Sequence, residues 1–271
     1  MINEPRVSIV TATYNSAKTV EDTLRSVIGQ TYRNIEYIIV DGGSTDGTLD
    51  ILDRYRDHIA VLISEPDGGI YDAFNKGVRR ARGEIVAILN SDDCYHDETV
   101  IEDVVAAFVE HDVDLVYGDM ELLLHDGSGQ RRLIKADIGG LKSRSTLHHP
   151  AVFVAQRVYR TDLYDDSYRL VADYEFMLRL HLAGKRFFYL ERPLAVMRTG
   201  GASHSRRIFA EAFRVHRQYF GLPYAAYRFT AMYGLQWGKD LRTRVLRRVL
   251  PDRVFSSLKK YWWSLRFNTK S

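Results

Sequence analysis

The sequence predicts an α/β fold in which helices cover both faces of a mostly parallel sheet, with a basic helical extension at the C-terminal end. Strand-like and helix-like patterns alternate through the first hundred residues, the order that builds a parallel sheet between helices. Beyond Gly200 the alternation gives way to helical segments rich in arginine and aromatic residues. Because 271 residues suffice for one large core, we expect one domain over residues 1–205 and an extension over 206–271.

Each expected strand is a short apolar run rich in β-branched residues. The runs that fit this pattern are 7–13, 35–40, 60–64, 84–89 and 114–117. A β-hairpin is expected over 120–134, around the turn-forming residues 125–129, and a polar loop with a Gly139-Gly140 hinge over 137–146.

Each expected helix carries apolar residues three or four positions apart. The first begins after Asn15 or Ser16, either of which can cap it. Further helices are expected near 49–55, from 70 to Gly83, over 99–111, and from Asp173 to Gly184.

Polar residues follow four of the expected strands. They are Thr13, Asp41, Asp67 and Asp92. Since ligands of parallel sheets bind beyond the carboxyl ends of the strands, these residues predict one binding site at that edge of the sheet.

Composition narrows the class of protein further. The single cysteine, Cys94, excludes an internal disulfide and a multi-cysteine zinc site. No run of eighteen apolar residues occurs, and the first residues lack the pattern of a signal peptide. We therefore expect a cytoplasmic protein. The first strand is followed by Thr13-Tyr14-Asn15-Ser16, which is neither a dinucleotide-binding glycine motif nor a P-loop.

Charge divides the chain. Residues 206–271 carry 15 Lys and Arg against 3 Asp and Glu, whereas residues 1–205 carry 23 against 32. In 241–271 the basic residues alternate with Trp, Tyr and aliphatic residues, a pattern typical of a peripheral helix at the inner face of the plasma membrane. The alternative is an amphipathic helix packed on the domain or on a second subunit of a homo-oligomer. Nucleic acid is not the expected partner.

Two acidic motifs indicate the chemistry. Asp92 and Asp93 directly follow an apolar run, where paired carboxylates can hold a divalent cation, Mg²⁺ or Mn²⁺, beside phosphates. The alternative is an acidic turn that caps the next helix. Asp173 is a separate acid that can serve as a base, or as an N-cap. Together they predict a metal-assisted displacement at a phosphate-bearing donor.

The order of these motifs resembles glycosyltransferase family 2, and in particular bacterial transferases that assemble O-antigen or exopolysaccharide repeats. The matching segments are 7–15, 41–48, 65–77, Asn90-Ser91-Asp92-Asp93, Tyr117-Gly118-Asp119, His148-His149 and Ala172-Asp173-Tyr174. The resemblance implies a GT-A fold, a Rossmann-like sheet flanked by helices. It also implies an inverting transfer of a sugar from a nucleotide-diphosphate sugar to a hydroxyl of a lipid-linked or oligosaccharide acceptor.

The resemblance also implies roles for single residues. Asp41 would accept the imide N–H of the base, which favours a UDP-sugar, unless it only forms the turn before Gly-Gly. Thr11, Ala12 and Tyr14 would surround the base and ribose. Asp173 would be the catalytic base.

The remaining candidates lie in the matched segments. Further donor-binding candidates are Asp67, Gly69, Asn75, Ser91 and Asp92. For the metal they are Asp93, Asp92 and His204, and for the acceptor or the sugar they are Asp119, His148 and His149. Asp67 has the alternative of anchoring the glycine turn, and the histidines that of a structural role.

Two other classes of function stay open at this stage. One is a sugar-nucleotide nucleotidyltransferase, although the loop after the first strand lacks the glycine-rich, basic sequence that holds a triphosphate. The other is a non-catalytic protein that binds membranes or nucleic acid through the basic extension.

Overall fold

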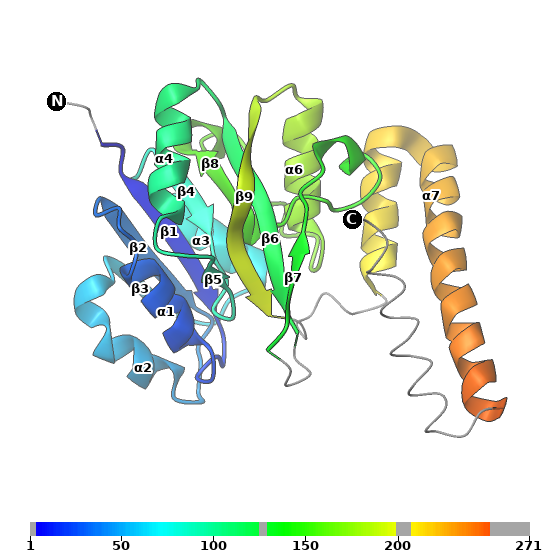
Figure 1. Cartoon of the computed structure of the whole chain (residues 1–271), viewed down its shortest axis with the longest axis horizontal. Helices are drawn as coiled ribbons and strands as arrows, with labels where there is room; N and C mark the ends of the chain where they lie inside the picture. The colour runs from blue at the N-terminus through cyan, green and yellow to red at the C-terminus, as the bar shows by residue number, and fades with distance from the viewer. Residues whose placement is uncertain (1–3, 125–128, 199–206, 250–271) are drawn as a thin grey trace. The chain divides into compact units, whose positions relative to one another are not determined.

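The computed structural model describes residues 4–124, 129–198 and 207–249. One mixed sheet runs through the first of two compact units, residues 1–211 and 212–271. Its strand order is β3-β2-β1-β4-β8-β6-β9-β5, with β7 paired to β6 (Figure 1). The strands are β1 (Val7–Thr13), β2 (Ile35–Asp41), β3 (Val61–Ser64), β4 (Ile85–Ile88), β5 (Cys94–Tyr95), β6 (Leu115–Leu123), β7 (Arg131–Ile134), β8 (Val152–Ala155) and β9 (Phe187–Arg198).

The sheet is mostly parallel. Strands β1 to β4 pair in parallel, and so do β6 and β9, whereas β8 runs antiparallel to both β4 and β6. All seven residues of β1 are buried, as expected for a central strand covered on both faces. The register pairs Thr13 with Asp41 and Asp41 with Ser64, so these three strand ends lie at one edge of the sheet.

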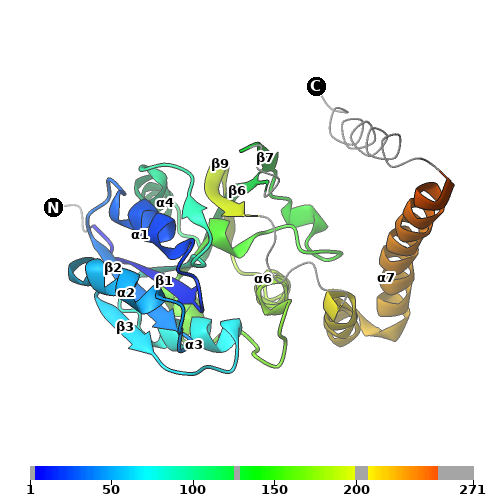
Figure 2. The ribbon, with the colours of Figure 1, turned by 90° about the horizontal axis from the view of Figure 1, so that it is seen from below.

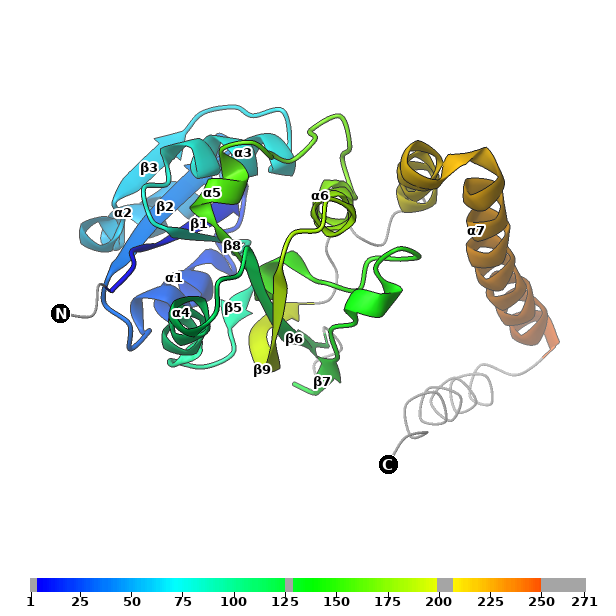
Figure 3. The ribbon, with the colours of Figure 1, turned by 90° about the horizontal axis from the view of Figure 1, so that it is seen from above.

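Helices cover both faces of this sheet. Figures 2 and 3 show α1 and α4 on one face and α3 on the other. The helices are α1 (Val20–Ile28), α2 (Thr48–Arg54), α3 (Ile70–Arg80), α4 (Val100–Glu110), α5 (Gln156–Tyr159), α6 (Ala172–Leu182) and α7 (Arg207–Val249). Gly77 lets α3 approach β1 closely, because a Cβ atom there would lie 2.2 Å from Cγ1 of Val10.

Helix α7 belongs in part to the second unit. It contains Pro223, and Gly221 interrupts it with a φ of 81° and a ψ of 169°. Within the described residues, no helix is both long and apolar enough to span a membrane. The expected helical character beyond Gly200 is confirmed for residues 207–249.

Most expected elements are confirmed, and the differences have local causes. Helix α1 begins at Val20, not at Asn15 or Ser16, because Asn15 takes a left-handed φ of 49° and the Ser16 carbonyl accepts the amides of Thr19 and Val20 in a turn. The strand expected at 114–117 continues to Leu123 and forms the outer hairpin with β7. Strands β5, β8 and β9 were not expected.

Candidate functional site

The loops that follow β1, β2 and β4 are tied to one another at the carboxyl edge of the sheet. The backbone amide of Asn15 donates to Ser44 Oγ at 2.8 Å, and that of Ser16 donates to Thr48 Oγ1 at 2.8 Å. The Ser16 hydroxyl lies 2.8 Å from that of Ser91. The edge is therefore built as one hydrogen-bonded unit from segments that are far apart in the sequence.

Asp41 forms the inner support of this unit. Its carboxylate is fully buried, and Oδ2 accepts from the backbone amides of Gly43 (3.1 Å) and Ser44 (3.0 Å) and from the Ser64 hydroxyl (2.7 Å). Oδ1 accepts from the Ser44 hydroxyl. Four donors fill the positions of a carboxylate. The structure therefore corrects the expected contact of Asp41 with a base: the residue forms the turn.

Asp67 is the acid that remains open beside this turn. Its Oδ1 accepts the amide of Gly69 at 2.8 Å and so anchors the glycine turn. A Cβ atom added to Gly42 would lie 2.8 Å from Asp67 Oδ2 and 3.3 Å from Cδ2 of Tyr14. The second carboxylate oxygen of Asp67 thus occupies the space that a side chain at position 42 would need. Tyr14, 63% exposed, presents its ring at the same place.

Asp93 is a buried acid whose two carboxylate oxygens have no hydrogen-bond partner within the described part of the chain. Burial, and then the negative charge of Asp92, raise the pKa of Asp93 well above its ordinary value. An unpaired buried carboxylate is costly unless a cation or a donor compensates it. Asp92 beside it is half-buried. This arrangement fits a divalent cation held by Asp93 and Asp92, which are the hard oxygen ligands such ions prefer.

The other ligand expected for the metal, His204, lies outside the described residues. Among the residues that the structure describes, no group of three acidic, histidine or cysteine side chains is arranged to hold a metal. The two adjacent aspartates are therefore the protein ligands that the described residues offer.

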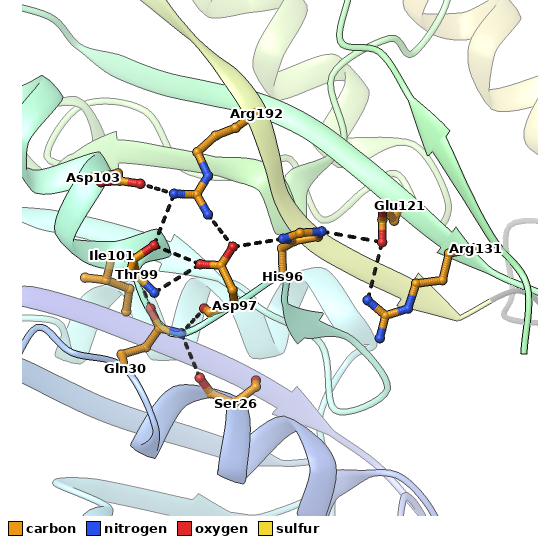
Figure 4. Close-up of polar contacts among 10 residues, drawn as sticks. All are labelled: Ser26, Gln30, His96, Asp97, Thr99, Ile101, Asp103, Glu121, Arg131 and Arg192. Atoms are coloured by element: carbon orange, nitrogen blue, oxygen red, sulfur yellow. Dashed lines mark hydrogen bonds and ion pairs between the residues drawn. The ribbon is translucent and has the colours of Figure 1, made fainter.

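A polar network fixes the chain that leaves the Asp92-Asp93 motif. Figure 4 shows Arg192 of β9 reaching both Asp97 and Asp103, while His96 lies between Asp97 (3.0 Å) and Glu121 (3.6 Å). The Gln30 side chain donates to the carbonyls of Ser26 and Asp97 and accepts the amide of Ile101. Thr99 bonds Asp97 and Arg192, and Arg131 bonds Glu121. The motif is thereby held against α1, α4, β6 and β9.

Asp173 lies in the first turn of α6, where residues from two other segments surround its carboxylate. Oδ1 accepts from the hydroxyl of Tyr71 in α3 at 3.0 Å and from the amide of Tyr174 at 2.9 Å. Oδ2 lies 3.2 Å from Nδ1 of His149. Nε2 of His149 in turn lies 3.0 Å from Nδ2 of Asn90, the residue that opens the Asn90-Ser91-Asp92-Asp93 motif. A short chain of contacts thus joins the two acidic motifs.

These contacts keep Asp173 ionised. Burial alone would raise the pKa of its carboxyl, but the hydrogen bond and charge of His149, and then the hydroxyl of Tyr71, outweigh it and lower the pKa below the ordinary value. Burial and the charge of Asp173 raise the pKa of Tyr71 well above its usual range, so its hydroxyl stays a donor. The N-cap of α6 is Val171; the expectation that Asp173 caps this helix was wrong.

Several of the expected ligand residues make structural contacts. Thr11 and Asn75 are buried: the Thr11 hydroxyl lies 3.1 Å from that of Tyr37, and both ends of the Asn75 amide bond the backbone of Tyr164. Ser91 is buried with its hydroxyl on Ser16.

Asp119, expected near the acceptor or the sugar, is also buried. It accepts from the Tyr189 hydroxyl (2.8 Å) and the Ala136 amide (2.9 Å), and its Oδ2 lies 2.8 Å from Nζ of Lys135. Its carboxylate therefore holds the strand pair β6–β9 to the segment after β7.

The other candidates keep their expected roles as predictions. Ala12 is buried at the end of β1, Gly69 caps α3 with a φ of 118°, and His148 is half-buried. Burial lowers the pKa of His148, which keeps its ring neutral. The contacts of Tyr71 with Asp173 and of Asn90 with His149 were not predicted. Both residues stood in segments that had been noted, Asn90 in Asn90-Ser91-Asp92-Asp93 and Tyr71 in 65–77, but the sequence does not show that their side chains meet the Asp173–His149 pair.

Comparison with known proteins identifies the family. The family model for glycosyl transferase family 2 matches residues 8–155. A PGL/p-HBAD biosynthesis glycosyltransferase of Mycobacterium bovis is 33% identical over 180 residues, which are 65% of this chain and 69% of that protein.

Solved structures share the fold. TarS 1-349 of S. aureus, in complex with UDP-GlcNAc, has a TM-score of 0.65 at 21% identity, covering 79% of this chain and 65% of that one. The chain thus spans less than two thirds of this TarS chain. Mannosyltransferase PcManGT from Pyrobaculum calidifontis, in complex with GDP-Man and Mn²⁺, has a TM-score of 0.61 at 20% identity, covering 99% and 89% of the two chains.

These likenesses agree with the mixed sheet and its flanking helices, which form a GT-A fold. A match to a glycosyltransferase family argues against the two alternatives, a sugar-nucleotide nucleotidyltransferase and a non-catalytic binding protein. The match over residues 8–155, together with the relative that is 33% identical, shows that this chain belongs to glycosyltransferase family 2.

Proposed function

We propose that this chain is an inverting glycosyltransferase that moves a sugar from a UDP-sugar to a hydroxyl of a lipid-linked or oligosaccharide acceptor in bacterial surface polysaccharide synthesis. The observation that carries the proposal is the chain of contacts from Asp173 through His149 to Asn90. It brings Asp173 near the acidic pair that follows β4, which supports a single site in which Asp173 accepts the proton and the acidic pair serves the leaving group.

The proposed chemistry needs one displacement. The acceptor oxygen attacks the anomeric carbon while the nucleoside diphosphate leaves from the opposite side, which inverts the configuration, and the acceptor's proton passes to Asp173. A carboxylate with a lowered pKa is a weak base, so it serves best when proton transfer comes late, after the bond to the leaving group has lengthened. A divalent cation held by Asp93 and Asp92 would neutralise the charge that grows on the diphosphate.

Donor recognition is assigned to Tyr14 and Asp67 in this proposal. The exposed Tyr14 ring offers a face for the base, and the open oxygen of Asp67 accepts an imide N–H, which adenine lacks. Relatives of the same fold are solved with UDP, UDP-GlcNAc and GDP-Man. We favour UDP, and binding of the three candidate diphosphates tests that choice.

The first experiment is calorimetric titration of UDP, GDP and dTDP, each with and without Mn²⁺ or Mg²⁺. We expect metal-dependent binding of UDP, and its loss in the Asp92→Ala, Asp93→Ala double variant, because these two carboxylates would hold the cation. Failure of all three diphosphates to bind would overturn the proposal. UDP binding that does not depend on a metal would contradict only the proposed role of the cation in donor binding.

The second experiment tests the base. Asp173→Asn removes the proton acceptor but keeps a similar shape, so we expect UDP affinity within about twofold of wild type and turnover lowered by about 100-fold or more. Turnover is measured as UDP release from UDP-GlcNAc, UDP-glucose or UDP-galactose, whichever wild type uses fastest. Retained turnover would take the role of base from Asp173.

A further inference from the structure

The Asp173 carboxylate meets a histidine from another part of the chain, and this contact has a definite geometry. His149 opens the short turn His149–Ala151 just before β8 and has 13% of its side chain exposed. Its ring packs against that of Phe74, with the centroids 5.5 Å apart. The ring is therefore held from three sides, by Phe74, by Asn90 and by the carboxylate.

The partner on the far side sets the tautomer. The Asn90 side-chain nitrogen that faces Nε2 of His149 can only donate. With the Asn90 amide nitrogen toward Nε2, a neutral ring accepts there and carries its proton on Nδ1, which then donates to Asp173 Oδ2 (3.2 Å). Since the Asp93 amide donates to the Asn90 carbonyl at 3.1 Å, the same asparagine belongs to the turn that carries Asp92 and Asp93.

The donors on Asp173 are distributed unequally. Among the residues that the structure describes, Oδ1 receives two donors, from Tyr71 and from the Tyr174 amide, whereas Oδ2 receives only the His149 ring. A carboxylate oxygen has about two lone-pair positions. One position on Oδ2 is therefore left for the proton of an acceptor hydroxyl.

We propose that His149, held by Asn90, is the positioning residue of the base: it fixes the Asp173 carboxylate so that the second lone pair of Oδ2 stays open to the acceptor. The inference rests on the proposed function, because it takes Asp173 as the base. In this proposal His149 acts on proton transfer by holding the Asp173 carboxylate, and it does not contact the sugar.

The other groups that face Asp173 are neutral. Burial raises the pKa of Tyr71 and of Tyr164 well above the usual range and lowers that of His148. Among these neighbours His149 lowers the pKa of Asp173 most, through its hydrogen bond to Oδ2. Removing this ring should raise that pKa and leave the phenols unchanged.

The test compares His149→Leu, which loses both ring contacts, with His149→Asn, which keeps a donor near the place of Nδ1. His181→Gln, in the same helix as Asp173, is the control. We expect kcat of UDP-sugar turnover to fall about 10- to 100-fold in His149→Leu, with donor KM nearly unchanged. The acidic limb of the kcat profile should move to higher pH, because a raised pKa protonates the base earlier. His149→Asn should restore part of the rate.

A wild-type rate and acidic limb in folded His149→Leu, while Asp173→Asn is inactive, would overturn this inference and leave the proposed function standing. If His149→Leu does not fold, His149→Asn carries the kinetic test. A ¹⁵N spectrum of the histidine rings provides a readout without turnover: we expect His149, assigned by its loss in His149→Asn, to carry its proton on Nδ1. A proton on Nε2 alone would also overturn the inference.

Discussion

At the scale of single residues, UDP binding in the proposed donor site should depend on Asp67 and on the absence of a side chain at Gly42. Its missing side chain leaves room for Asp67, whose Oδ2 would lie 2.8 Å from a Cβ atom there. We expect Gly42→Ala to push this carboxylate away and to weaken UDP binding about tenfold, and Asp67→Asn to weaken it about 10- to 100-fold, because a hydrogen bond to a charged group is lost.

Gly68→Ala is the matched control, since a Cβ atom at this position makes only ordinary contacts of 3.5 Å and more, with Asp72. Calorimetry with UDP measures all three variants. Affinity that is equal in Asp67→Asn and wild type would remove Asp67 from base recognition and leave the fold and the acidic pair unaffected.

Several candidate ligand residues make structural contacts that the sequence could not reveal. Thr11, Asn75 and Asp119 each have a partner far away in the sequence, namely Tyr37, Tyr164 and Tyr189. A polar residue at a strand end or in a helix looks the same in the sequence whether it faces a ligand or a buried tyrosine. The acids of the two motifs were recognisable because they followed an apolar run or belonged to a known order of segments.

At the scale of elements, the alternation of strands and helices in residues 7–110, apart from the two-residue strand β5, was predictable, because each of these elements carries its own periodicity. The second half of the sheet was not. Strand β8 is only four residues long, and β9 is half-buried along most of its length, so neither shows a clear pattern. Both are defined by pairing with distant strands, β4 and β6.

The network around Arg192 predicts how these elements respond to acid. Burial alone would raise the pKa of Asp97, but His96, Thr99 and Arg192 outweigh it and depress that pKa far below the value of 3.8. A depressed folded-state pKa contributes stability that is present above the unfolded value and is lost as the pH falls through the folded one. The free energy of unfolding should therefore decline as the pH drops below about 4.

Arg192→Met should lower the free energy of unfolding by about 1–2 kcal/mol at neutral pH, and it should flatten this decline. Arg131→Met is the control, since its pair with Glu121 at 3.4 Å has an arginine side chain that is 51% exposed, and such pairs contribute less than about 1 kcal/mol. Urea denaturation between pH 7 and pH 3.5 measures both. Equal losses of unfolding free energy in Arg192→Met and Arg131→Met would contradict a special stabilising role for the contacts of Arg192.

For the whole molecule, the opposite charges of its two parts suggest where it works. We propose a peripheral position at the inner face of the membrane through residues 241–271, of which 250–271 lie outside the described residues. Residues 206–271 carry 15 basic side chains against 3 acidic ones, and each basic group near an anionic surface contributes about 1 kcal/mol. The domain boundary at residue 205 stays a prediction. The structure divides into the compact units 1–211 and 212–271.

Sedimentation with vesicles tests this proposal. We expect the full chain to sediment with phosphatidylglycerol vesicles at low salt, much less at high salt, and not with phosphatidylcholine vesicles, because the attraction is electrostatic. A chain ending at residue 211 should stay in the supernatant, with UDP binding as its control for folding. Equal sedimentation of both chains, or none of either, would contradict a membrane role for the extension.

The order of strands in the sheet also has a consequence during synthesis. Strands β3, β2, β1 and β4 come from the first 88 residues, whereas the neighbour that closes the free side of β4 is β8, at Val152–Ala155. Until that strand leaves the ribosome, Ile85–Ile88 is paired with β1 on one side only, and its side toward β8 stays open. A nascent chain stalled between these two strands would expose an aggregation-prone edge, so the interval before β8 is where a chaperone has most to protect.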